Sequence, residues 1–155
     1  MSFRKRYFFF DIDGTLLPSS EDPVIPPSAR EGIDELRQRG YFCCLATGRS
    51  EYMSRDLCRE LGFDNLVSDG GYGITLEGNK AAGIRQVMDY YGAPYEDVVV
   101  FGDQRNDLSM FYPEEWTCIA MGNACDEVKA RATYVTKDVR DDGLAHALRH
   151  FGWID

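Results

Sequence analysis

The chain has 155 residues, of which 44% are hydrophobic and 28% charged, a composition typical of one compact soluble domain covering residues 1–155. Its formal net charge of -9 at pH 7 argues against nucleic acid as a partner, because phosphate backbones select basic surfaces. No apolar run approaches membrane-spanning length, and the run at residues 7–10 is too short for a signal peptide, so we expect a cytoplasmic protein without a membrane partner. The 5 cysteines include no C-x-x-C pair, which indicates free thiols.

Short apolar runs alternate with helical patterns along the chain, which predicts an α/β fold with a doubly wound, Rossmann-like parallel sheet. The first run, residues 7–10, is continuously apolar, as expected for a strand covered by helices on both faces. The expected strands are residues 7–10, 41–46, 66–67, 98–101, 117–121 and 134–135. Helices are expected between them, and the last helix covers residues 142–150.

Two of the expected helices carry specific signals. Ser28 and Glu31 have the S-x-x-E spacing of a capping box, which predicts the start of the first helix. In the second helix Met53, Leu57 and Leu61 recur with helical spacing, so they are expected to face the core.

Polar residues directly follow three of the predicted strands. Asp11 and Asp13 follow the first strand, Thr47 and Gly48 the second, and Asp103 the fourth. Because the carboxyl ends of parallel strands share one edge of the sheet, these residues are expected in one crevice. Close carboxylates repel unless a cation or proton lies between them, and oxygen-only ligands suit Mg²⁺. Each segment taken alone also fits an ordinary turn or helix cap.

Lys80 is expected at the first position of a helix capped by Asn79. A lysine is mildly unfavourable at a helix start and is ordinarily a solvated surface charge. Its position weakly favours a role beside a bound anion, while the surface interpretation stays open. Arg49 likewise either contacts substrate or pairs with a nearby acid.

Four segments, in order, resemble the motifs of the haloacid dehalogenase-like (HAD) hydrolases, and most closely those of the Cof-like sugar-phosphatase branch. These segments are residues 11–16 (DIDGTL), residues 46–49 (ATGR), Lys80 and residues 102–110 (GDQRNDLSM). Residues 120–124 and 141–145 also resemble the C-terminal signature of that branch.

The resemblance implies a Mg²⁺-dependent phosphatase that hydrolyses phosphate monoesters of small metabolites, such as sugar phosphates, through an aspartyl-phosphate. It implies Asp11 as the nucleophile and Asp13 as the general acid/base. The residues implied to hold the substrate's phosphoryl group are Thr47, Gly48, Lys80 and Asn106. The residues implied to bind the metal are Asp11, Asp13 (through its backbone carbonyl) and Asp103, with Asp107 supporting the metal's water shell.

The chain departs from the family pattern where a cap domain is expected. Cof-like enzymes normally insert an α/β cap between the third strand and the motif lysine, whereas here only residues 70–79 separate them, enough for a small hairpin. Two explanations stay open. The chain is naturally capless, and a neighbouring subunit of a homo-oligomer or a bulky substrate covers the site. Alternatively, the cap was removed by engineering, which leaves a core with weak generic activity.

Three other functions stay open. A phosphomutase or phosphotransferase of the same family would pass the phosphoryl group to an acceptor hydroxyl in place of water. A phospho-receiver signalling module would carry its phospho-acceptor after the third strand, where Asp69 stands. A binding protein on an inactive core is disfavoured by the complete set of motif residues.

His146 and His150 have the spacing of metal ligands but lack a third ligand, so an ordinary helix is favoured.

Overall fold

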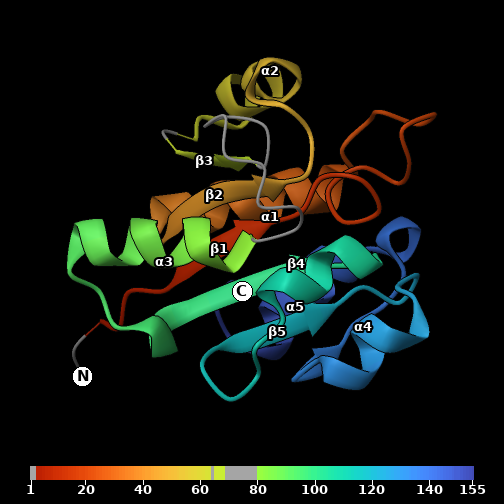
Figure 1. The fold of residues 1–155 in the computed structure, drawn as a ribbon. Helices are drawn as coiled ribbons and strands as arrows, with labels where there is room; N and C mark the ends of the chain where they lie inside the picture. Colours follow the sequence, from red (N-terminus) through yellow and green to blue (C-terminus); the bar gives the residue numbers. More distant parts are fainter. Residues whose placement is uncertain (1–2, 64, 69–79) are drawn as a thin grey trace.

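The computed structural model describes residues 3–63, 65–68 and 80–155. Its centre is a 6-stranded parallel sheet with the strand order β3-β2-β1-β4-β5-β6 (Figure 1). The strands are β1 Tyr7–Phe10, β2 Phe42–Thr47, β3 Leu66–Ser68, β4 Val98–Gly102, β5 Thr117–Ala120 and β6 Tyr134–Val135. This order is that of a doubly wound sheet, with β1 between β2 and β4, so the predicted α/β fold is confirmed.

Helices cover both faces of the sheet. The α-helices are α1 Pro27–Gln38, α2 Glu51–Leu61, α3 Lys80–Tyr91, α4 Asp126–Arg131 and α5 Gly143–His150. The 3₁₀ helices are η1 Tyr95–Asp97, η2 Arg105–Met110 and η3 Val139–Asp141. Figure 1 shows α3 on one side of the strands, with α1 and α5 on the other. None of the helices in the described ranges is both long and apolar enough to cross a membrane.

Strand β1 shows why the two faces need separate cores. Successive side chains of a strand point to opposite faces, and every residue of β1 is buried. Phe8 and Phe10 belong to the core shared with α1 and α5, while Tyr7 and Phe9 belong to the core shared with α3. A continuously apolar strand is therefore required at the centre of the sheet.

Helix α1 begins differently from the sequence prediction. The expected capping box of Ser28 and Glu31 is wrong, because Pro26 is the N-cap and no side chain caps the helix. Pro27 is the first helical residue, and its fixed φ suits the first turn, where the N–H that proline lacks would have no partner within the helix. The hydroxyl of Ser28 instead donates to Oδ1 of Asp142 at 2.5 Å, which ties α1 to the start of α5.

The predicted inward face of α2 is confirmed for Leu61, which is buried, and for Leu57, which packs partly buried against the core, but it is wrong for Met53. Met53 is 61% exposed, whereas Ser54, Cys58 and Leu61 are buried. The buried Ser54 is polar, so the apolar pattern of the sequence does not indicate it as part of the inward face. Its burial is tolerated because its hydroxyl donates to the backbone carbonyl of Ser50 at 3.0 Å. The expected hairpin at residues 70–79, the Asn79 cap and Asp69 lie outside the described residues.

Candidate active site

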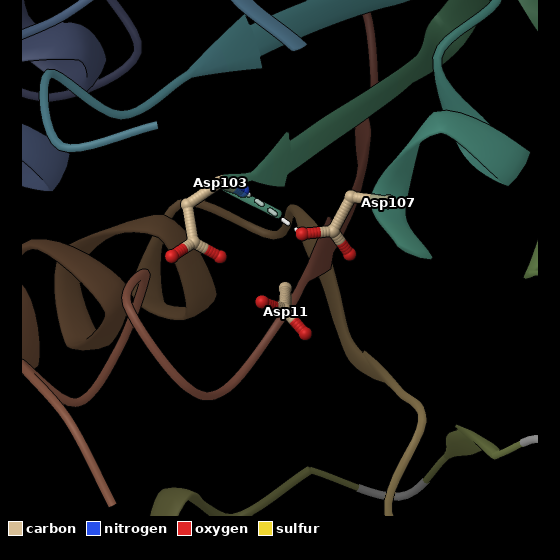
Figure 2. Close-up of side chains that lie close together, drawn as sticks. All are labelled: Asp11, Asp103 and Asp107. Atoms are coloured by element: carbon tan, nitrogen blue, oxygen red, sulfur yellow. Dashed lines mark hydrogen bonds between the residues drawn. The ribbon is translucent and has the colours of Figure 1, made fainter. Parts of the chain in front are cut away.

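Three carboxylates meet at the carboxyl edge of the sheet (Figure 2). Asp11 follows β1, and its backbone N–H donates to the carbonyl of Phe101 in β4 at 3.1 Å, which continues the pairing of the two strands. Asp103 follows β4, and Asp107 lies in η2. The three side chains are buried, and one oxygen of each lies within 4.8 Å of the others. The sequence prediction that Asp11 and Asp103 converge is therefore correct in geometry.

A glycine turn allows this convergence. Residues 12–17 fold into a tight turn after β1, in which the N–H of Gly14 donates to the carbonyl of Leu17 at 2.7 Å. Gly14 has φ of 80°, a conformation that favours glycine. A Cβ at this position would lie 1.7 Å from Oδ2 of Asp103. Only glycine lets the turn pack directly against this carboxylate.

We expect Gly14→Ala to weaken binding of Mg²⁺ by at least about tenfold, because the added methyl group displaces Asp103 from the carboxylate cluster. Gly92→Ala is the matched control, since Gly92 also has positive φ, 62°, but a Cβ there meets no atom of the described residues within 4 Å. Both variants lose about 1–2 kcal/mol of stability, because alanine is strained in the left-handed conformation. Isothermal titration with MgCl₂ separates this shared strain from the displacement of Asp103, which is expected only in Gly14→Ala. Equal affinities in the two variants would contradict the steric argument.

Lys80 lies inside the carboxylate cluster and is completely buried. Its Nζ donates to Oδ1 of Asp107 at 2.5 Å and to Oδ1 of Asp11 at 3.1 Å. Burial alone lowers the pKa of this ammonium group, but the two carboxylates outweigh burial, so the net pKa of Lys80 is raised. The interpretation of Lys80 as a solvated surface charge is wrong, and the lysine is held protonated between two acids.

Asp107 occupies a more central place than the sequence suggests. Its Oδ2 accepts the backbone N–H groups of Asp103 at 2.9 Å and Gln104 at 3.1 Å. A Cβ on Gly102 would come within 2.9 Å of three Asp107 side-chain atoms, so glycine is needed before Asp103. Asp107 thus orders the backbone that carries Asp103 and also belongs to the carboxylate cluster.

The electrostatics of the cluster fit a cation. Burial raises the pKa of Asp11 well above its ordinary value, and the neighbouring Asp107 carboxylate raises it further, against the opposing effect of Lys80. Burial likewise raises the pKa of Asp103 to about 6. Oδ1 of Asp103 is buried without a hydrogen-bond partner in the described part of the chain. A buried acceptor of this kind costs free energy unless a cation or donor meets it, and an all-oxygen donor set suits Mg²⁺.

The side chain of Asp13 lies apart from the carboxylate cluster. It is partly exposed and forms a bidentate ion pair with Arg49, with Nε to Oδ2 at 3.0 Å and Nη2 to Oδ1 at 2.5 Å. Of the two interpretations left open for Arg49, the structure shows pairing with an acid. The Asp13 carboxylate does not join the predicted metal ligands Asp11 and Asp103. If Asp13 contacts the metal, the contacting atom is therefore its backbone carbonyl oxygen.

The other predicted substrate-binding residues lie at different depths in the structure. Thr47 ends β2 and is buried, with Oγ1 accepting the backbone N–H of Arg49 at 3.0 Å. Gly48 is exposed in the loop that leads to α2, and Asn106 is exposed in η2. The carbonyl of Asn106 accepts the Ser109 hydroxyl at 2.9 Å, and that hydroxyl accepts the N–H of Lys80 at 3.2 Å.

Sequence reasoning gave no role to Asn123, which contacts this site. Its Nδ2 donates to the carbonyl of Gly14 at 2.9 Å, and its Oδ1 accepts the N–H of Val139 at 2.9 Å. The signal available in the sequence was its place in residues 120–124, which resemble a family signature.

His146 and His150 both contact Tyr134. Nε2 of His146 lies 3.1 Å from the Tyr134 hydroxyl, and the ring of His150 stacks on the Tyr134 ring. Neither histidine belongs to the metal-ligand group found among the described residues.

Comparison with known proteins defines the class of this chain. A family model described as haloacid dehalogenase-like hydrolase matches residues 8–78 and 74–148. The chain therefore belongs to the haloacid dehalogenase-like hydrolases, the family that its motifs resemble.

Individual relatives agree with this assignment. The chain is 43% identical over 74 residues, 47% of its length, to the 5-amino-6-(5-phospho-D-ribitylamino)uracil phosphatase YitU of Bacillus subtilis (strain 168). The HAD subclass IIB sugar phosphatase BT4131 superposes with a TM-score of 0.80 and 21% identity over 97% of this chain and 100% of that chain. The 3-deoxy-D-manno-octulosonate 8-phosphate phosphatase of Moraxella catarrhalis, solved with magnesium, phosphate and KDO, superposes with a TM-score of 0.76 and 22% identity over 92% and 83% of the two chains.

The chain spans less than a third of the length of several curated relatives. The matched segment covers 27% of YitU and 29% of YcsE from the same organism. The alignment with YkrA of Bacillus subtilis (strain 168), at 22% identity, covers 96% of this chain and 98% of YkrA, and it runs over 256 positions although this chain has 155 residues. The difference in length agrees with the prediction of a core without a cap domain.

Proposed function

We propose that this chain is a single catalytic core that hydrolyses phosphate monoesters of small metabolites, such as sugar phosphates, with Mg²⁺ as its cofactor. One observation supports the proposal most strongly: Asp11 lies buried beside Asp103, Asp107 and the ammonium group of Lys80, and one oxygen of Asp103 has no hydrogen-bond partner in the described ranges. YitU and BT4131 are named as phosphatases, and the Moraxella catarrhalis enzyme was solved with magnesium and phosphate.

The proposed reaction has two displacements at phosphorus. In the first, a carboxylate oxygen of Asp11 forms a bond to phosphorus while the ester P–O bond breaks, and Asp13 gives a proton to the leaving oxygen. In the second, Asp13 takes a proton from water, whose oxygen attacks phosphorus, and inorganic phosphate leaves as the carboxylate of Asp11 is restored. Thr47, Gly48, Lys80 and Asn106 are proposed to hold the phosphoryl oxygens. Mg²⁺, when bound by Asp11, Asp103 and the Asp13 carbonyl, would neutralise charge that develops on those oxygens.

The ion pair with Arg49 has a consequence for this mechanism. Both oxygens of Asp13 accept from the Arg49 guanidinium, so neither oxygen presents a proton to a leaving group in this arrangement. We propose that one of these two hydrogen bonds opens when substrate enters. The released oxygen would take up a proton from solvent, which reaches the partly exposed side chain of Asp13, and pass it to the leaving oxygen while Arg49 holds Asp13 by the other bond.

The activity is tested with a generic aryl phosphate in MgCl₂ and in excess EDTA, followed by a panel of sugar phosphates and other metabolite phosphates. Hydrolysis that requires Mg²⁺ supports the proposal, and no hydrolysis of any ester under either condition rejects it. Analysis of products with an added sugar acceptor then separates a phosphatase from a phosphomutase or phosphotransferase.

We expect Mg²⁺ to raise the melting temperature of the wild-type protein and to have little effect on Asp103→Asn, which loses a charged ligand. A ligand at about 100 times its dissociation constant stabilises a protein by about 2.7 kcal/mol. Asp56→Asn is the control, because Asp56 is a solvent-exposed carboxylate on α2 whose side chain is 97% exposed. Thermal unfolding in EDTA and in a MgCl₂ series provides the measurement, and an identical magnesium response in wild type and Asp103→Asn would refute the proposed ligand.

We also propose that a second subunit or a bulky substrate covers the site in place of a cap. Light scattering with and without substrate tests this proposal, and selective turnover of one small ester by a proven monomer would count against it.

A further inference from the structure

Asn123 connects four segments at the carboxyl edge of the sheet. It follows β5, and its amide nitrogen donates to the Gly14 carbonyl at 2.9 Å and approaches Oδ2 of Asp103 at 3.5 Å. Its amide oxygen accepts the N–H of Val139, the first residue of η3, at 2.9 Å. One side chain thus joins the turn after β1, the end of β4 and the segment after β6.

The orientation of this amide is determined by its neighbours. A backbone N–H can only donate, so the group facing Val139 must be the amide oxygen. The other end of the amide faces the Gly14 carbonyl and an ionised Asp103 carboxylate. Both of these groups can only accept, so the NH₂ group must face them. The reversed amide would place like groups against each other at all three contacts.

The segment that holds the amide oxygen is itself held by close packing. A Cβ on Gly122 would lie 2.5 Å from the backbone nitrogen of Asp138, and the Gly122 N–H donates to the Lys137 carbonyl at 3.0 Å. The chain after β6 therefore packs directly on residue 122, which brings the N–H of Val139 to Asn123. The contact with the N–H of Val139 therefore fixes the orientation of the Asn123 side chain.

The contacts of Asp103 are divided unequally between its two oxygens. Oδ2 receives Asn123 and, at 3.2 Å, Nε2 of Gln104, and the Gly14 turn packs against it. Oδ1 is buried with no partner among the described residues. The carboxylate is therefore oriented so that one oxygen is satisfied by protein and the other is left for a ligand.

We propose that Asn123 is a positioning residue for the metal site: by holding Oδ2 of Asp103 and the Gly14 turn, it presents Oδ1 of Asp103 to the cation. This inference rests on the Mg²⁺ site of the proposed function. Partners that orient a metal-binding carboxylate typically contribute about 10–100-fold to metal affinity. Asn123 has no contact with the reacting atoms in this arrangement, so its effect is on the binding of the metal.

The test is isothermal titration of the purified protein with MgCl₂, without substrate. Asn123→Ala is expected to raise the Mg²⁺ dissociation constant about tenfold. Thr133→Val is the matched control, because Oγ1 of Thr133 accepts the N–H of Cys118 at 3.0 Å, a similar bond at the opposite end of β5. It is expected to retain the wild-type affinity. Gln104→Ala, which removes an exposed donor to the same oxygen, is expected to weaken binding about threefold and serves if Asn123→Ala does not fold.

The outcomes separate this inference from the proposed function. Wild-type affinity in both Asn123→Ala and Gln104→Ala, with clear binding by the unchanged protein, overturns the positioning role and leaves the metal site intact. No binding of Mg²⁺ by the unchanged protein overturns the metal site and the positioning role together. Equal weakening in Asn123→Ala and Thr133→Val shows a general effect of lost stability and also overturns the proposal.

Discussion

Asp11→Asn is expected to lower the turnover of an aryl phosphate by about 10⁴-fold or more, because an amide oxygen is a poor nucleophile toward phosphorus. Asparagine has almost the same size as aspartate, so the buried position after β1 should tolerate it. The change also removes one of the two carboxylates that contact Lys80. The rate is measured at saturating MgCl₂ over a range of substrate concentrations, so that a change in kcat is separated from a change in KM.

The fold of Asp11→Asn is compared with wild type by circular dichroism, and Asp56→Asn, an exposed carboxylate, serves as the activity control. A phosphoryl group trapped on wild type and mapped to residue 11 would support the covalent step. Turnover by Asp11→Asn at the wild-type rate would rule out Asp11 as nucleophile.

Lys80→Met should produce the largest loss of stability. Its ammonium group lies between Asp11 and Asp107, and methionine leaves two buried carboxylates without their cation. Removing one partner of a buried ion pair costs about 3–5 kcal/mol, so we expect a fall of this size in the free energy of unfolding in EDTA. Mg²⁺ should restore part of the loss, since a divalent cation neutralises the same carboxylates. Loss of a charge that stabilises the transition state should also lower kcat by about 10²–10³-fold.

Chemical denaturation in EDTA and in MgCl₂ provides the stability measurement. Lys137→Met is the comparison, because Lys137 is exposed and lies outside the carboxylate cluster. If both lysine variants unfold at the same denaturant concentration in EDTA, Lys80 is not the counter-charge that its contacts indicate.

Much of the fold could be predicted because it follows from local patterns. Continuous apolar runs identified β1 and β4, and the residues immediately after them identified Asp11 and Asp103. The parallel sheet then brings these two together without further information, since both strands end at the same edge. The prediction failed where burial was offset by a hydrogen bond, as with Ser54 on the inward face of α2, and where proline replaced a side-chain cap at the start of α1.

The details of the site were less accessible from sequence. Nothing in the spacing of residues 80 and 107 shows that their side chains are 2.5 Å apart, because that contact depends on the packing of α3 against η2. The pairing of Asp13 with Arg49 joins segments 36 positions apart, and sequence reasoning left it as one of two options. Asn123 was missed because an asparagine after a strand also fits an ordinary turn.

The central place of β1 affects how firmly Asp11 is held. Strand β1 is hydrogen-bonded on both sides, by β2 and β4, and all its side chains are buried, whereas β6 at the edge has only two residues. Local fluctuations open edges and loops first, and central strands open only when the whole domain unfolds. Asp11, which directly follows β1, is therefore expected to keep its place when edges and loops fluctuate, as the attacking role proposed for it requires.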